Sequence, residues 1–214
     1  MNEQVNLKKI SETEWFCAFK LPDDVHQYLW HRIEEAKKEN EDHRENLAGN
    51  ISHSLTLRDP NNWIVDKIFY GLFNSDLKKF FTDRVDRVTR SSFDKGSVGL
   101  KPELTRMWVN FQKKYEYNPL HDHSGAFSFV IWMKIPYDWK DEKELPWTKG
   151  IHTDTAGNFC FLDNSFTTHT FKMDKSAEGY CCFFPSDFYH QVYPFYTSDE
   201  ERVSISGNIF FVEP

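Results

Sequence analysis

The chain has no long hydrophobic run, since no apolar stretch approaches the 18 residues that a membrane-spanning helix requires. The first residues, Met1-Asn2-Glu3-Gln4, also lack the apolar segment of a secretory signal. Positive charge does not predominate, because 26 Lys and Arg stand against 33 Asp and Glu, a net charge of −7. This balance argues against non-specific binding to nucleic acid or to an anionic membrane. We therefore expect a cytoplasmic protein that has no membrane partner and for which nucleic acid is an unfavourable ligand.

Cysteine is scarce, and its spacing excludes two common kinds of site. The four cysteines are Cys17, Cys160, Cys181 and Cys182, and no pair has the CxxC spacing of a zinc knuckle or a redox motif. Cys181 and Cys182 are adjacent, so in a strand they point to opposite faces and do not easily share a metal. Free, buried thiols in a reducing compartment are the expectation. The sequence also has no internal repeat and no low-complexity tract.

Aromatic residues, by contrast, are abundant and indicate a β-rich core. They make up 17% of the 214 residues, and 20 residues are Phe. Aromatic side chains are enriched in strands, and a chain of this length can bury one substantial core. We predict one domain over residues 1–214, with an N-terminal strand and supporting helices in 1–103 and a strand-rich core that carries the functional site in 104–214.

Local sequence patterns predict where the helices and strands lie. Apolar residues at helical spacing predict helices over residues 21–38, 63–73 and 76–88. Runs rich in aromatic and β-branched residues predict strands near residues 12–19, 51–57, 105–115, 127–135, 157–162, 168–173, 179–184, 188–193 and 202–212. Many short strands preceded by helices are typical of a mainly β protein with a double-stranded β-helix (jelly-roll, cupin-like) core, whose interior can hold a ligand.

Three histidines have a spacing that suits a metal site. In an extended strand His121 and His123 share one face, while Asp122 points to the other. His190 lies far downstream, in an aromatic and β-branched run that predicts another strand. Two imidazoles from one strand and a third from a strand across the barrel would hold one ion and leave coordination positions open, as non-haem Fe(II) chemistry requires. His121, His123 and His190 are the predicted metal ligands and catalytic centre.

A second group of residues suits a carboxylate. Arg202, Ser204 and Ser206 alternate with Val203 and Ile205, so they share one face of the last predicted strand. A guanidinium beside a hydroxyl can bind a carboxylate through two charge-assisted hydrogen bonds. Arg202 and Ser204 are therefore predicted to bind a cosubstrate. Asn110, on the strand that leads to the histidine pair, is a further candidate, although its amide could instead be satisfied within the strand.

Together these residues resemble the Fe(II)/2-oxoglutarate-dependent oxygenases, and most closely a group common in marine bacteria and their phages with the order His-x-His, His, Arg-x-Ser. The first 45 residues carry none of its motifs. The resemblance implies that Fe(II) and 2-oxoglutarate are the cofactors, and that a C–H bond is hydroxylated with release of succinate and carbon dioxide. The matching segments are Leu47–Ile51, Trp108–Asn110, Asn118–His123, Phe183–Pro194 and Arg202–Asn208.

One departure from the usual pattern leaves alternatives open. Most such oxygenases have His-x-Asp/Glu before the distant histidine, whereas this chain has His123 at that position; His-x-His resembles the phage-type group. Asp122 could be the ligand instead if the backbone were twisted. A three-histidine site is also typical of cupin-type metal dioxygenases that do not use 2-oxoglutarate, and a jelly roll without metal could be a noncatalytic binding protein. Bound iron together with succinate release distinguishes these classes.

Two features of the sequence bear on the prime substrate. Resemblance to prolyl-hydroxylase-like enzymes slightly favours a peptide or protein. Residues 136–150 are highly charged and contain Trp139 and Trp147. This segment is either a lid over the substrate or an exposed charged hairpin.

Overall fold

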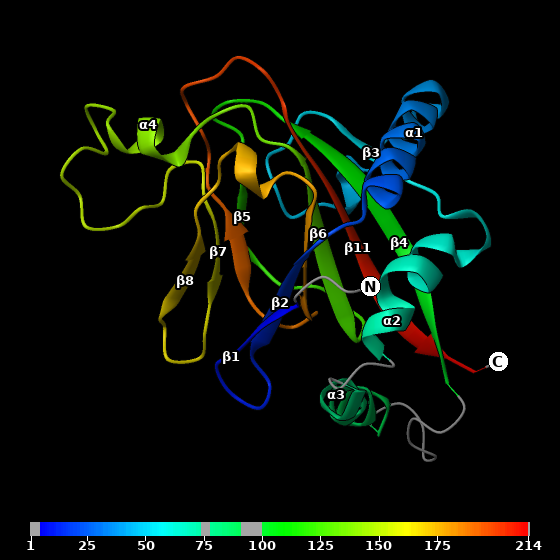
Figure 1. The fold of residues 1–214 in the computed structure, drawn as a ribbon. Helices are drawn as coiled ribbons and strands as arrows, with labels where there is room; N and C mark the ends of the chain where they lie inside the picture. Colours follow the sequence, from blue (N-terminus) through cyan, green and yellow to red (C-terminus); the bar gives the residue numbers. More distant parts are fainter. Residues whose placement is uncertain (1–4, 74–77, 91–99, 214) are drawn as a thin grey trace.

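The computed structural model describes residues 5–73, 78–90 and 100–213 (Figure 1). Across these residues the strands form two antiparallel sheets. The larger sheet has seven strands in the order β1 (Asn6–Lys9), β2 (Trp15–Lys20), β9 (Tyr180–Pro185), β6 (Phe127–Lys134), β11 (Arg202–Val212), β4 (Lys101–Gln112) and β3 (Ser54–Thr56). The smaller has four, in the order β5 (Asn118–His121), β10 (His190–Val192), β7 (Phe159–Leu162) and β8 (Thr168–Phe171).

The pairing of the strands from β4 onward defines the fold. β4 pairs with β11, β5 with β10, β6 with β9, and β7 with β8, all antiparallel. Each pair is therefore nested inside the previous one, and successive pairs alternate between the two sheets. A long hairpin rolled up in this way is a double-stranded β-helix, or jelly roll. The predicted fold class is confirmed.

Strands that precede residue 104 join the same sheet. β1 and β2 extend the larger sheet beyond β9, and β3 lies beside β4 at its other edge. The division of one domain into residues 1–103 and 104–214 stays a prediction, but these N-terminal strands share hydrogen bonds with strands of the C-terminal part.

Helix α1 (Asp23–Glu39) covers the expected segment 21–38 almost completely. It follows Pro22 and has acidic residues in its first turn, which suit the positive end of the helix dipole. It ends at Asn40, whose φ of 52° is left-handed and whose N–H donates to the Ala36 carbonyl oxygen. Its buried face consists of Val25, Leu29, Ile33 and Ala36. The helical spacing in the sequence thus identified the core-facing side.

The expected helix 63–73 has an irregular start. It begins as a π-helical turn, η3 (Val65–Phe69), and continues as α2 (Tyr70–Phe73). The helix expected over 76–88 corresponds to α3 (Lys78–Arg90), and its first two residues lie outside the described residues. The remaining helices are short: η1 (Arg44–Asn46), η2 (Pro60–Asn62), α4 (Trp139–Lys143) and η4 (Lys175–Ala177). In the described residues, no helix combines the length and the apolar character needed to cross a membrane.

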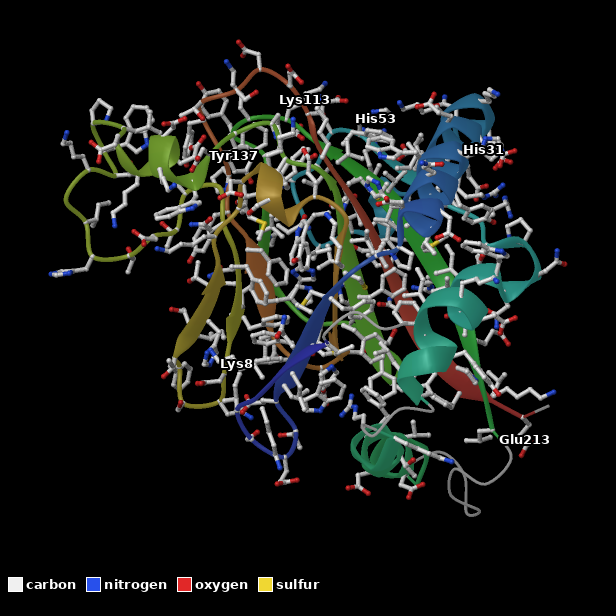
Figure 2. The ribbon with its side chains drawn as sticks, viewed as in Figure 1. Lys8, His31, His53, Lys113, Tyr137 and Glu213 are labelled. Carbon is white, nitrogen blue, oxygen red and sulfur yellow. The ribbon has the colours of Figure 1, made fainter. Side chains whose placement is uncertain are left out.

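Alternation along β6 divides the core into two layers. Phe127, Phe129, Ile131 and Met133 belong to the cluster packed with the helices, whereas Val130 and Trp132 belong to the cluster that includes residues of the smaller sheet. Aromatic rings fill both layers, and side chains occupy the space between the ribbons of the two sheets and the helices (Figure 2). The second layer surrounds the candidate site.

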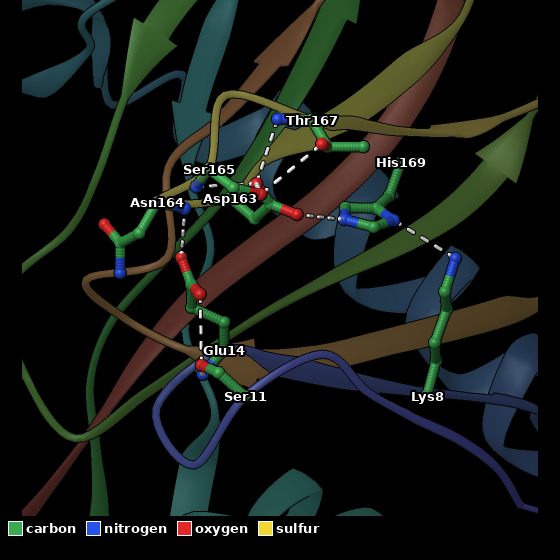
Figure 3. A network of polar contacts seen from close by, with 8 residues as sticks. All are labelled: Lys8, Ser11, Glu14, Asp163, Asn164, Ser165, Thr167 and His169. Atoms are coloured by element: carbon green, nitrogen blue, oxygen red, sulfur yellow. Dashed lines mark hydrogen bonds and ion pairs between the residues drawn. The ribbon is translucent and has the colours of Figure 1, made fainter.

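A polar network joins the N-terminal hairpin to the β7–β8 hairpin (Figure 3). Glu14 accepts from the backbone N–H of Asn164 at 2.6 Å. Asp163 accepts from Ser165 Oγ at 2.6 Å and from the His169 ring at 2.8 Å, and Lys8 Nζ lies 3.1 Å from the other ring nitrogen of His169. The Ser165 hydroxyl is the main reason why the pKa of Asp163 lies far below its usual range. The network fastens the edges of the two sheets to each other.

Candidate metal centre and anion site

The jelly-roll pairing brings the three predicted histidines together. β5 ends at His121, whose register partner at the start of β10 is His190. His123 follows β5 in a loop, where its backbone N–H donates to the Ser186 carbonyl oxygen at 2.8 Å. The ring centroid of His121 lies 4.3 Å from that of His190 and 4.9 Å from that of His123, and the centroids of His123 and His190 are 5.0 Å apart. His190 therefore lies on the strand next to His121, not across the barrel as its sequence position led us to expect.

Two of these imidazoles have a defined orientation. His121 Nδ1 lies 2.7 Å from the Pro119 carbonyl oxygen, and His190 Nδ1 lies 2.9 Å from that of Phe188. A carbonyl oxygen only accepts, so each Nδ1 carries the hydrogen and each Nε2 keeps its lone pair. A ring held through its second nitrogen is the usual form of a metal-binding histidine.

The environment also keeps the three rings neutral. Burial lowers the pKa of His121, lowers that of His123 to about 3 and lowers that of His190 well below its usual value. One ligand atom from each ring lies within 4.8 Å of the others, and no second group of this kind occurs in the described residues. Asp122 is exposed and is not part of the cluster. Three neutral nitrogens around one point suit a transition-metal ion.

The histidines line a cavity of about 120 Å³ within the jelly roll. Its wall is partly aromatic, with Trp108, Trp132, Phe159 and Phe184. Its polar lining contains Asn110, Gln112, Asn118, Asp122, Arg202, Ser204 and Ser206. All of the predicted cosubstrate residues therefore face the same space as the histidines.

Arg202 is a buried cation in the lining of this cavity. Its side chain is held by neutral groups: Nη1 donates to Tyr137 Oη at 2.6 Å and to the Gly157 carbonyl oxygen at 3.0 Å, and Nη2 donates to Gln112 Oε1. The residue is only 3% exposed, and among the residues that the structure describes no carboxylate lies within ion-pairing distance of it. A buried charge is costly without a counter-charge. A ligand carboxylate would provide that counter-charge.

Asn110 and Ser204 lie beside this guanidinium. They are register partners on β4 and β11, and both line the cavity. Asn110 is 5% exposed, and its Oδ1 has no hydrogen-bond partner in the described part of the chain. This oxygen only accepts, so a ligand that pairs with it must bring a donor, which a dicarboxylate lacks; toward a carboxylate Asn110 can offer only its Nδ2 hydrogens. The alternative expectation, an amide satisfied within its strand, does not apply to Oδ1.

Sequence reasoning missed two residues that position Arg202. Gln112 is the register partner of Arg202 and could have been found, because it alternates with Asn110 along the same strand. Tyr137 lies in an irregular segment, and its contact with Arg202 depends on how the chain returns at Gly157. No local sequence pattern indicates that contact.

Other polar residues of the sequence lie elsewhere. Lys134, a cation at the end of β6, pairs with Glu200 at 2.6 Å and is partly exposed. His152 is exposed. The segment 136–150 is anchored through the fully buried Glu142, which accepts from the backbone N–H groups of Tyr196 and Thr197. Trp147 in the same segment is 59% exposed.

Sequence comparison agrees with this geometry. Residues 106–208, which contain all the predicted site residues, match the profile of a family described as "Putative 2OG-Fe(II) oxygenase". The chain resembles the 2-oxoglutarate–Fe(II) oxygenases. It is an enzyme of the Fe(II)/2-oxoglutarate-dependent dioxygenase type, and Fe(II) and 2-oxoglutarate are the cofactors of that type. The predicted resemblance, enzyme class and cofactors are confirmed.

Two solved structures are similar to this oxygenase. One is a prolyl-4-hydroxylase of Pseudomonas putida, with 15% identity, a TM-score of 0.47 and coverage of 93% of this chain and 92% of that chain. The other is an oxidoreductase of the 2OG-Fe(II) oxygenase family from Burkholderia pseudomallei, with 15% identity, a TM-score of 0.44 and coverage of 91% and 83%. No curated protein sequence matches the oxygenase.

Proposed function

We propose that the chain is a hydroxylase in which His121, His123 and His190 hold Fe(II), and in which Arg202, with Ser204 and Asn110, binds 2-oxoglutarate. The observation that carries this proposal is the buried guanidinium without a carboxylate partner, in the same cavity as three neutral imidazoles. A metal alone does not compensate a buried cation. A dicarboxylate that reaches from the cation to the metal compensates it.

The residues of the chain prepare this site in three ways. Tyr137, Gln112 and the Gly157 carbonyl oxygen fix the guanidinium, so that little reorganisation is needed when a carboxylate binds. Pro119 and Phe188 orient two of the imidazoles. The aromatic residues Trp108, Trp132, Phe159 and Phe184 make part of the wall apolar. The cofactors, when bound, supply the oxidation of a C–H bond, with release of succinate and carbon dioxide.

Three neutral ligands also set the charge of the centre. A His-x-Asp/Glu oxygenase places one negative charge on the metal, whereas this donor set places none. Asp122 is exposed beside the centre and outside the cluster. We expect weaker iron binding and a higher reduction potential than with a carboxylate ligand, because ligand charge stabilises the oxidised ion.

We place the prime substrate among peptides or proteins and the enzyme in a reducing compartment such as the cytoplasm. Exposed aromatic side chains support the first point: Tyr115 and Trp147 are exposed, and their ring centroids lie 5.6 Å and 5.7 Å from that of the half-buried Tyr196. Aromatic side chains of this kind are enriched where proteins bind other chains. The four cysteines, all free and buried, support the second point.

Iron and succinate measurements test the assignment. The chain is loaded anaerobically with Fe(II), and bound metal is measured before and after addition of 2-oxoglutarate and oxygen. We expect stoichiometric iron and succinate formation that depends on 2-oxoglutarate. His190→Ala should lose the iron, and His152→Ala, which removes an exposed histidine, should keep it. Stoichiometric iron in His190→Ala would exclude this metal centre, and oxidation of substrate without 2-oxoglutarate would favour the cupin-type alternative.

A further inference from the structure

One of the three histidines is held differently from the other two. The rings of His121 and His190 each donate from Nδ1 to a backbone carbonyl oxygen. Among the residues that the structure describes, no hydrogen bond reaches the ring nitrogens of His123, whose ring lies against Trp108 and the other two imidazoles. The position of His123 therefore depends on its backbone, whose N–H donates to the Ser186 carbonyl oxygen at 2.8 Å.

The turn between β9 and β10, residues 186–188, holds two of the proposed ligands at once. Its first carbonyl oxygen, that of Ser186, accepts from the backbone N–H of His123. Its last, that of Phe188, lies 2.9 Å from Nδ1 of His190 and accepts from it. The placement of these two ligands relative to each other is consequently set by the position of this one turn.

Helix α3 reaches this turn through one buried arginine. Arg84 is 4% exposed. Its Nη1 pairs with Asp187 Oδ2 at 2.8 Å, and its Nε donates to the Ala126 carbonyl oxygen at 3.1 Å. Ala126 lies three residues after His123, and its carbonyl oxygen also accepts from the Ser186 N–H at 3.3 Å. One guanidinium thus joins the loop that carries His123 to the turn that holds both ligands.

Arg84 acts on the centre only through these two segments. It does not line the cavity, and neither of its hydrogen bonds is to a histidine of the cluster. A buried guanidinium is costly to leave without acceptors, so its bonds to Ala126 and Asp187 restrain both segments. The carboxylate of Asp187 is itself more than half exposed, so the restraint comes from the buried side of the pair.

We propose that Arg84 is a positioning residue of the metal centre and sets the place of His123 relative to His190. Groups that support metal ligands from behind tune both the affinity and the geometry of a site. Here the supporting group comes from α3, so the helical part of the chain contributes to the centre as well as covering the larger sheet. This inference rests on the proposed function, because it takes the histidine cluster as the metal centre.

The first measurement needs no metal. Amide hydrogen exchange of His123, followed by NMR in the metal-free chain, reports how firmly its N–H is held by Ser186. Arg84→Met should raise that exchange rate about tenfold, and Arg84→Lys, which keeps a cation, should restore most of the protection. Arg32→Met is the matched control, because Arg32 lies on α1 and likewise donates to a backbone carbonyl oxygen and pairs with a carboxylate. A rate in Arg84→Met equal to that in Arg32→Met overturns the inference.

The second measurement places a metal in the centre. Co(II) is titrated anaerobically into each chain, and its visible absorption reports the number and arrangement of the ligands. Arg84→Met should bind Co(II) about tenfold more weakly and with altered absorption bands, whereas Arg84→Lys should lie close to the unsubstituted chain and Arg32→Met should match it. An unchanged affinity and spectrum in Arg84→Met contradict a positioning role.

A second variant keeps the test decisive if Arg84→Met does not fold. Asp187→Ala removes only the exposed partner of Arg84, and it should give the same changes in His123 exchange and in Co(II) binding to a smaller extent. Absence of both changes overturns the inference. If the unsubstituted chain binds no Co(II), the proposed function fails, and the exchange rate of His123 then decides by itself whether Arg84 holds this histidine in place.

Discussion

Replacing Arg202 by Met would remove the buried guanidinium and keep a side chain of similar length. Three neutral acceptors now hold this cation, and no carboxylate of the described residues neutralises it. Without a ligand, the charge contributes little net stability, because burial costs what the hydrogen bonds regain. With 2-oxoglutarate bound, the same charge makes hydrogen bonds to a carboxylate. The substitution should therefore affect binding much more than folding.

The expected loss follows from those ligand hydrogen bonds. A hydrogen bond to a charged group contributes about 1.5–3 kcal/mol. The affinity for 2-oxoglutarate should consequently fall by about 10- to 150-fold. Arg202→Lys keeps the charge but loses the planar fork and most contacts with Tyr137 and Gln112, so its affinity should lie between that of Arg202→Met and that of the unsubstituted chain.

Calorimetric titration of 2-oxoglutarate into the anaerobic, metal-loaded chain measures the affinity directly, and urea unfolding shows whether the variants remain folded. Lys134→Met is the matched control, because it removes a cation that pairs with Glu200 at the surface. Its affinity for 2-oxoglutarate should not change. If Arg202→Met is folded and binds 2-oxoglutarate as tightly as the unsubstituted chain, the anion site lies elsewhere and the reasoning from the buried cation is wrong.

Three further substitutions test neighbouring parts of the site. Tyr137→Phe removes one acceptor of Arg202 and should raise the KM for 2-oxoglutarate several-fold with little change in kcat; an equal fall in kcat would contradict a positioning role. Glu142→Ala leaves the Thr197 hydroxyl and N–H without their acceptor and should cost about 1–3 kcal/mol in urea unfolding, unless water replaces the carboxylate. In the metal-free chain, burial lowers the pKa of His123 to about 3, so below about pH 6.5 the unfolded state binds a proton that the folded state does not. Stability should fall by about 2 kcal/mol for this ring between pH 6.5 and pH 5, and His123→Gln should show a smaller fall; an unchanged pH dependence would refute the assigned cause.

The elements were largely predictable because their signals are local. The alternation of Val130 and Trp132 with their neighbours on β6 reports two layers, and the spacing of Leu29 and Ile33 reports the buried side of α1. The π-helical start at Val65–Phe69 was not predictable, since it depends on how this segment packs and not on its composition. The sequence was sufficient to predict those helices and strands whose signal is the spacing of apolar residues along the chain.

The site was predictable in its residues but not in its geometry. The types and order of His121, His123 and His190 indicated a metal centre, although His190 proved to be on the adjacent strand because β10 pairs with β5. The pairing of β5 with β10 follows from the order of strands in the sheet, which the local sequence of either strand does not indicate. The same pairing contains a bulge, because His190 and Val192 of β10 pair with His121 and Asn118 of β5, and no single segment of the sequence determines that register.

The nested pairing of the strands also fixes when the centre can form. β7 and β8 are close in sequence and can pair early, whereas β5 with β10 and β4 with β11 must close much longer loops. The histidines and Arg202 lie on, or directly beside, these outer pairs. A nascent chain emerging from the ribosome therefore has no complete set of iron ligands until translation has passed β10, and no guanidinium for the cosubstrate until β11 follows.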